Sequence, residues 1–118
     1  MLLASPAGGS QATRPVIYAD AGGAPGALIA IGPETVVTAS PDGEWVPFAF
    51  SSPVALAPGT YWLGTITGGT SSATHHYIGT TPRARVYGWD PYGDDASNPA
   101  GPMQSSPGPI SIYAEYAP

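Results

Sequence analysis

The stretch that most constrains the fold runs from residue 43 to residue 69, where two aromatic-rich apolar runs flank a Pro58-Gly59 corner. In the first run, Val46, Phe48 and Phe50 fall on one face of an extended chain, because side chains alternate along a strand. The second run carries Tyr61, Trp62, Leu63 and Ile66. Aromatic and β-branched residues pack well on a pleated, half-buried surface. The stretch therefore predicts two neighbouring core strands on either side of a turn.

Short apolar runs separated by glycine and proline recur along the rest of the chain. They predict strands at residues 1–4, 15–20, 27–31, 34–39, 74–79, 83–87 and 110–116. The last of these alternates cleanly, with Ile110, Ile112, Ala114 and Tyr116 on one face, as in an antiparallel strand with one solvated side. Since no helical periodicity is sustained, we expect an all-β protein. The predicted architecture is an antiparallel two-sheet β-sandwich, jelly-roll-like, with about eight short strands.

The predicted sandwich is a single domain, because 118 residues suit one compact unit. Its expected core consists of Val46, Phe48, Phe50, Leu63, Ile110 and Ile112. Residues 88–109, which contain proline, glycine and several aspartates, predict a long surface loop. Loops of this length in compact domains are usually functional or disordered.

Charge and cysteine content exclude several classes of function. The chain has 3 basic residues against 8 acidic ones, and a net charge of −5. Nucleic acids and anionic membranes attract proteins through clustered Lys and Arg, so we expect no nucleic-acid partner and no membrane attraction. The absence of cysteine excludes disulfides and thiolate metal sites. The first residues lack the pattern of a signal peptide, and no apolar stretch is long enough for membrane insertion.

Catalytic chemistry has no signature in this sequence. Serines are plentiful, but no G-x-S-x-G nucleophile elbow occurs. Nothing selects one pair among the 8 acidic residues for the two-carboxylate chemistry of glycosidases. We therefore predict that the chain is not an enzyme and uses no cofactor.

Two segments, VIYADAGGAPGALIA (residues 16–30) and WVPFAFSSPVALAPGTYWLGTITGGT (residues 45–70), resemble a bacterial jelly-roll module. The module is the choice-of-anchor or carbohydrate-binding-like type of actinobacterial secreted proteins and phage virion proteins. The later segments ARVYGWDPYGDDASNPAGP and ISIYAEY resemble its loop and last strand. The resemblance implies a non-catalytic module appended to, or displayed on, something larger. It also implies a further strand before Leu2, whose absence here would leave a sheet edge uncovered.

The aromatic residues Tyr87, Trp89 and Tyr92 cluster at the start of the long loop and are the candidate contact residues. Sugars stack on exposed aromatic faces, so a glycan platform is one interpretation. Aromatic anchors are also typical of protein interfaces. The third interpretation is packing alone, with the rings folded back over a sheet edge.

Metal binding has only weak candidates. Asp90, Asp94 and Asp95, with Asn98 nearby, offer the oxygen ligands that calcium prefers, but their spacing is not that of an EF-hand. The alternative is a set of aspartate turns that bind their own backbone. His75 and His76 are adjacent and point to opposite faces of a strand, so they cannot together chelate one ion without distorting the strand. The alternative is a zinc site made by one histidine and a distant carboxylate. We therefore predict no metal site.

These features lead to two hypotheses of function. The first is a non-enzymatic structural or display module on the exterior of a phage particle, as a head decoration, fibre or tail protein. The alternative is a carbohydrate-binding or adhesive module of a secreted bacterial protein. Both place the chain on a virion or an extracellular surface. Because an uncovered edge strand invites pairing and lysine is absent, we also expect a homo-oligomer or a protein scaffold as partner.

Overall fold

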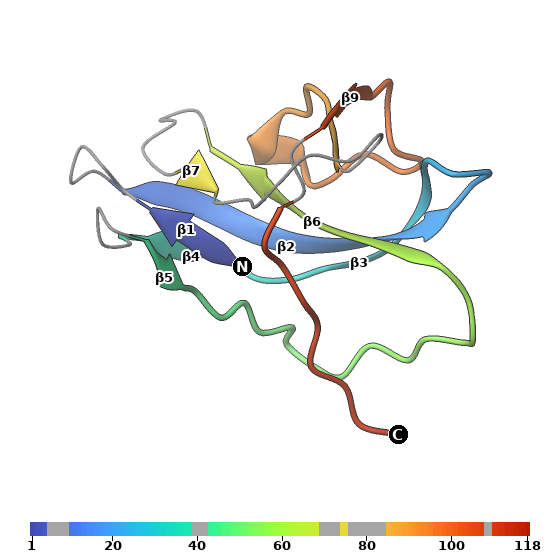
Figure 1. The fold of residues 1–118 in the computed structure, drawn as a ribbon, viewed down its shortest axis with the longest axis horizontal. Helices are drawn as coiled ribbons and strands as arrows, with labels where there is room; N and C mark the ends of the chain where they lie inside the picture. Colours follow the sequence, from blue (N-terminus) through green and yellow to red (C-terminus); the bar gives the residue numbers. More distant parts are fainter. Residues whose placement is uncertain (5–9, 39–42, 69–73, 76–84, 108–109) are drawn as a thin grey trace.

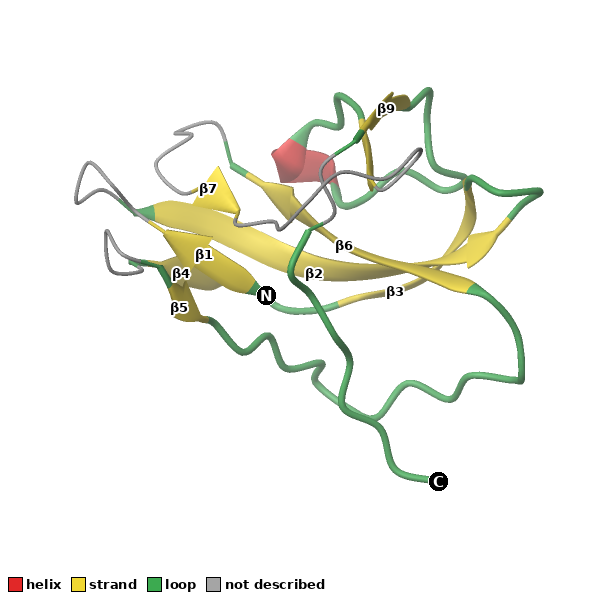
Figure 2. Cartoon of the chain, in the orientation of Figure 1, coloured by secondary structure: helices red, strands yellow, loops and turns green. Residues whose placement is uncertain are grey.

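The computed structural model describes residues 1–4, 10–38, 43–68, 74–75, 85–107 and 110–118. Within them the protein is all-β, all strand pairing is antiparallel, and the one helical segment is a short 3-10 turn, η1 (Tyr92–Asp94). The strands are β1 (Leu2–Ala4), β2 (Gln11–Asp20), β3 (Pro25–Ile31), β4 (Thr35–Val37), β5 (Glu44–Trp45), β6 (Tyr61–Thr67), β7 (Thr74–His75), β8 (Arg85–Tyr87) and β9 (Gln104–Ser106) (Figure 2). The predicted class, an antiparallel, sandwich-like all-β fold, is confirmed.

The described strands form three sheets. In the largest, β6 pairs with one edge of β2, while β3 and β4 share the other edge. A second sheet has the order β5-β1-β7, and β8 with β9 forms a two-stranded ribbon. Figure 1 shows β9 at the top of the molecule and the end marked C at the bottom. The ribbon and the last residues therefore lie at opposite ends of the fold.

The long central strand β2 carries the main core. Val16, Ile17 and Tyr18 are all buried, because the strand is covered on both faces as well as at both edges. One buried cluster unites Val16, Tyr18 and Ile66 with Ala96, a residue from the predicted loop. Side chains packed around this cluster are Leu28, Ile31, Trp62, Tyr92 and Ala100. Residues late in the chain thus complete the core of the sheet.

Proline sits inside β2, where a central strand normally excludes it. The pairing explains the exception: β4 pairs with β2 up to Thr13, and β3 pairs with it from Val16 onward. Pro15 lies where β4 has ended and β3 has not yet begun, so no ladder hydrogen bond requires its missing N–H. Its carbonyl accepts a hydrogen bond from the Gly32 N–H at 2.8 Å. The prediction that the strand begins at Pro15 is wrong, because β2 starts at Gln11.

A second, smaller cluster lies at the β1 and β4 end of the molecule. Val37 is 1% exposed and is packed by Met1, Val46 and Phe48. The predicted core residues Val46, Phe48, Phe50, Leu63, Ile110 and Ile112 are all half-buried, so the core prediction is corrected. Its centre moves from the aromatic-rich runs to β2, the longest strand, which has partners along both edges.

Two predicted strands are not strands. After β5 the chain has no ladder until β6, and residues 110–116 have none either. Pro47, Pro53 and Pro58 interrupt the first segment, and each lacks the N–H that a ladder needs. For residues 110–116, both edges of β2 are already occupied. The strand β6 therefore pairs with β2 and not with residues 46–56, contrary to the prediction of a neighbouring pair.

The predicted long loop at residues 88–109 also needs correction, because its described part contains η1 and the strand β9. The predicted strands 1–4, 27–31, 34–39 and 83–87 overlap β1, β3, β4 and β8, and residues 39, 83 and 84 lie outside the described residues. Of the predicted strand 74–79, Thr74 and His75 form β7, and the remainder lies outside the described residues. Among the described residues, no helix has both the length and the apolar character that crossing a membrane requires.

Candidate functional site

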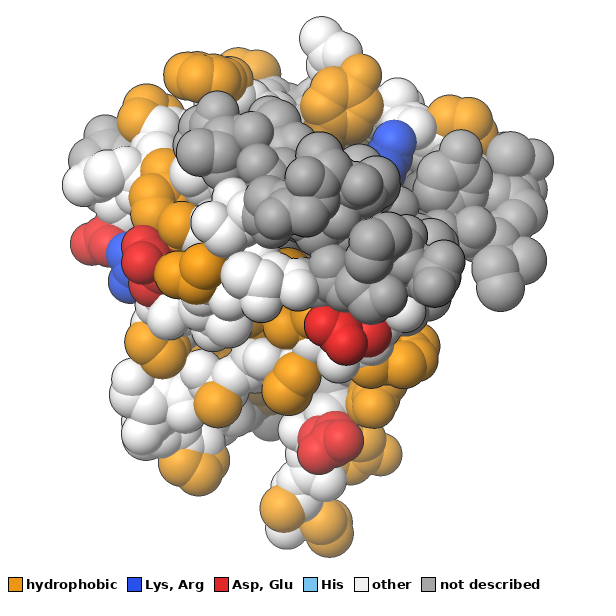
Figure 3. Space-filling model, turned by 90° about the vertical axis from the view of Figure 1, so that its left-hand side faces the viewer, with side chains coloured by type: hydrophobic (Ala, Val, Ile, Leu, Met, Phe, Trp, Pro, Cys, Tyr) orange, Lys and Arg blue, Asp and Glu red, His pale blue; other side chains and the backbone are white. Residues whose placement is uncertain are grey.

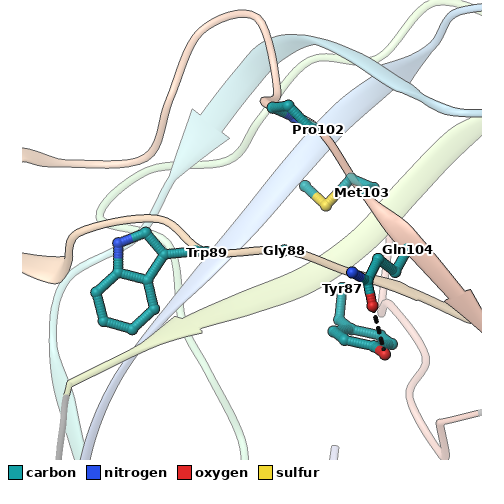
Figure 4. A pocket seen from close by; sticks show the side chains of 6 residues that line it. All are labelled: Tyr87, Gly88, Trp89, Pro102, Met103 and Gln104. Atoms are coloured by element: carbon teal, nitrogen blue, oxygen red, sulfur yellow. Dashed lines mark hydrogen bonds between the residues drawn. The ribbon is translucent and has the colours of Figure 1, made fainter.

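The candidate site is built on the β8–β9 ribbon. The register sets Tyr87 opposite Gln104, and the Tyr87 hydroxyl donates a hydrogen bond to Gln104 Oε1 at 2.9 Å. Figure 4 shows these two side chains together on one side of the ribbon, with Met103, the residue before β9, close by. The ribbon therefore presents a phenol and an amide side by side at the surface.

Trp89 follows directly after this ribbon and is 91% exposed. In Figure 4 its indole projects away from the other side chains. Tyr87, Trp89 and Met103 line an open depression of about 340 Å³ together with Gly88, Pro102 and Gln104. A Cβ on Gly88 would lie 2.6 Å from the Pro102 carbonyl oxygen, so only glycine allows this close approach of the two segments.

A hydrogen-bonded turn supports the chain on the far side of Trp89. The Asp90 carboxylate accepts the Ser97 N–H at 2.8 Å and the Ser97 hydroxyl at 2.6 Å. The Ser97 carbonyl accepts the Tyr18 hydroxyl at 2.9 Å, which ties the turn to β2. Burial, followed by the charge of Asp90, raises the pKa of Tyr18 above its usual value. The phenol therefore stays protonated and remains a donor at neutral pH.

The same segment covers the outer edge of β3. The Ala100 N–H donates to the Gly26 carbonyl at 2.9 Å, and the Leu28 N–H donates to Asn98 Oδ1 at 3.0 Å. These bonds satisfy backbone groups that would otherwise offer an open edge for pairing. Residues 90–100 are thus a structural cover and an anchor for Trp89, rather than a free binding loop.

The structure separates Tyr92 from the other two predicted contact residues. Its ring packs against the core cluster of Val16 and Tyr18, and its hydroxyl donates to the Glu34 carboxylate at 2.8 Å. Arg14 lies in the same region, where Nη1 pairs with Asp95 and Nε donates to the Gly32 carbonyl at 2.9 Å. Of the three predicted aromatic residues, Tyr87 and Trp89 line the same depression. Tyr92 lies in η1 and packs against the core of the β2 sheet instead.

Ionisation of Tyr92 is expected to destabilise the fold at alkaline pH. Burial, the hydrogen bond to Glu34 and the charge of Glu34 raise the pKa of Tyr92 to about 12, with Arg14 acting in the opposite direction. An unfolded tyrosine has a pKa of about 10, so the folded protein holds this proton more tightly. The resulting stability is present below about pH 10 and is lost as the pH rises toward 12.

Urea unfolding across this alkaline range measures the effect. The Tyr92→Phe variant should lose less stability than the wild type over the same range, because phenylalanine cannot ionise. Equal losses in the two proteins would show that Tyr92 does not contribute.

The weak calcium candidates Asp90 and Asp95 have protein partners in the structure, namely Ser97 and Arg14. In the described part of the chain, no group of three His, Asp or Glu side chains is placed to hold a metal ion. The side chains of His75 and Asp94, and the whole of His76, lie outside the description. Asp90 thus accepts the hydrogen bonds that close a turn, and Asp95 forms an ion pair with Arg14.

Sequence reasoning found Tyr87 and Trp89 but missed Pro102, Met103 and Gln104, which complete the depression. Those three residues lie in a proline- and glycine-rich segment without strand alternation, and their position depends on pairing with β8. No protein-family model matches the chain, and no curated protein or solved structure shows a significant similarity to it.

Proposed function

We propose that the chain is a non-enzymatic binding and display module that attaches to a protein scaffold through the depression around Trp89. The observation that supports this proposal is the 91% exposure of Trp89 beside Tyr87 and Met103, which are 51% and 38% exposed. Exposed apolar side chains that gather in one patch, rather than being scattered singly, are typical of sites where a partner binds. Aromatic anchors of this kind carry much of the energy of protein interfaces.

The setting that we propose for this module is the exterior of a phage particle, as a head decoration, fibre or tail protein. The support comes from the sequence segments that resemble modules of virion proteins. In this setting the all-β core is a stable carrier, and the β8–β9 ribbon is the contact surface. The other interpretation of the sequence, an adhesive module of a secreted bacterial protein, keeps the same surface and changes only the partner.

A specific feature favours glycan binding as the second candidate function. The Tyr87 hydroxyl and the Gln104 amide are hydrogen-bonded to each other and line the same depression as Trp89. Aromatic faces with a few well-placed polar groups are the combination that binds small polar ligands. In this candidate function, a sugar ring stacks on the Trp89 indole, and the side-chain amide of Gln104 forms hydrogen bonds with the hydroxyl groups of the sugar.

Binding of the purified chain to each virion structural protein encoded beside its gene tests the first proposal, and a polysaccharide panel tests the second. Trp89→Ala should weaken the relevant complex by about 2 kcal/mol, or roughly 30-fold. The matched control is Trp45→Ala, which removes a 52% exposed indole from a different sheet and should bind normally.

The outcome also separates the two candidates. Loss of binding to a virion protein supports the scaffold function, and loss confined to a polysaccharide supports the glycan function. A Trp89→Ala variant that binds every tested partner as the wild type does would contradict both. Capsid or tail genes on either side of this gene favour the virion setting, while an upstream hydrolase reading frame favours the secreted one.

A further inference from the structure

Residues 110–116, here called the last segment, have the sequence of a strand but do not pair with any strand in the described part of the chain. Ile110, Ile112, Ala114 and Tyr116 alternate with Ser111, Tyr113 and Glu115, and the segment contains no proline. Every residue of the segment therefore carries a backbone N–H donor. The segment follows an extended path to the bottom of the molecule (Figure 1).

Within the described residues, the last segment has no backbone hydrogen bond to another strand. Its described side-chain interaction is an edge-on ring contact between Tyr113 and Trp45, with centroids 5.2 Å apart and planes at 64°. Tyr113 is 61% exposed and Tyr116 is 89% exposed. A row of backbone groups that lack a strand partner among the described residues, beside exposed aromatic rings, is a template for another strand.

We infer that the last segment pairs antiparallel with the same segment of a second copy of this chain, across a two-fold axis at Tyr113. A two-fold contact requires only one surface, provided that this surface is complementary to itself. The alternation meets this condition. On one face of the pair Ile110 lies opposite Tyr116 of the second copy, and Ile112 lies opposite its Ala114. Aromatic and β-branched residues stabilise each other when they lie directly opposite on neighbouring strands.

Charge excludes one alternative register. With Tyr113 opposite itself, Glu115 faces Ser111 of the second copy, and no like charges meet. A slip that centres the axis on Glu115 would bring the two carboxylates together, which is unfavourable. A slip that centres it on Ala114 would place Ile110 opposite Pro118, which has no backbone N–H to donate. The contact centred on Tyr113 therefore keeps the whole segment paired without repulsion.

The surroundings do not oppose this contact. Only 9% of all residues are charged and there is no lysine, the usual guard of an exposed edge. The view in Figure 3 shows hydrophobic side chains spread over the face, including its lowest projection, with few charged groups between them. The inference is independent of the proposed function, because the depression around Trp89 lies on the β8–β9 ribbon at the other end of the molecule.

Disulfide trapping tests the register. The chain contains no native cysteine, so any disulfide that forms must involve the introduced residues. The Ser111→Cys and Glu115→Cys variants are prepared separately with fusion tags of different mass, so that mixed and identical pairs can be told apart. The two proteins are then mixed and mildly oxidised. Directly opposite residues lie about 4.5–5.5 Å apart, within the range of a disulfide. Identical positions lie roughly 14 Å apart in this register, beyond that range. We expect cross-linking between the two variants in the mixture and none in either variant alone.

Substitutions of opposite charge at one position provide the second test. Ser111→Lys places a cation opposite Glu115 and should strengthen the dimer in sedimentation, whereas Ser111→Glu should weaken it. Because both changes are at one site, effects on folding are matched, and circular dichroism checks them. Cross-linking in the Ser111→Cys variant alone would overturn the register. A wild-type chain that stays monomeric up to about 1 mM would overturn the dimer.

Discussion

Replacing Tyr18 by alanine is expected to lower the free energy of unfolding by about 3–5 kcal/mol. Tyr18 is 6% exposed in the second half of β2, where its ring belongs to the cluster of Val16, Ile66 and Ala96. Truncation removes the ring from the core and leaves a cavity that the surrounding strands cannot fill. Urea unfolding followed by circular dichroism measures the loss.

A Tyr18→Phe variant separates the ring from the hydroxyl. It keeps the packing and loses the hydrogen bond to the Ser97 carbonyl, which should cost about 1 kcal/mol. If Tyr18→Ala were as stable as the wild type, Tyr18 would not belong to the core, and the assignment of β2 as its centre would fail.

The second large effect is expected at Asp90. Its carboxylate holds the Ser97 N–H and the Ser97 hydroxyl, and hydrogen bonds to a charged group contribute about 1.5–3 kcal/mol. Asp90→Ala should therefore destabilise the protein by roughly 3 kcal/mol and release the turn that anchors Trp89. Chemical unfolding gives the stability, and the tryptophan emission wavelength, compared with that of Trp89→Phe, reports on the surroundings of Trp89.

The matched variant Asp90→Asn retains one acceptor oxygen of similar shape. It should lose about half as much stability as Asp90→Ala, because the charge is gone but one hydrogen bond can remain. Equal stability of Asp90→Ala and the wild type would mean that the Asp90–Ser97 turn does not hold the segment. The tested surface around Trp89 would then lack its structural support.

The candidate site was only half accessible to sequence reasoning. Tyr87 and Trp89 are recognisable because large aromatic residues stand beside glycine, proline and aspartate in a segment with no other apolar pattern. Tyr92 looks the same in the sequence but is drawn to the sheet by Glu34, a residue 58 positions earlier. Met103 and Gln104 enter the site through pairing with β8, and such non-local pairing leaves no local pattern.

Local chemistry determined the class of the fold. Alternating apolar residues, turn glycines and the absence of helical periodicity act within a few residues, so the sequence alone predicts antiparallel strands and locates β3, β4 and β8 closely. Pairing is different, because a strand needs a free edge next to it. Pro15 is tolerated inside β2 only because β3 and β4 share that edge, while residues 110–116 alternate well and find both edges of β2 occupied. Which alternating runs become strands was therefore decided by the tertiary structure, since backbone hydrogen bonds must be satisfied between segments distant in the chain.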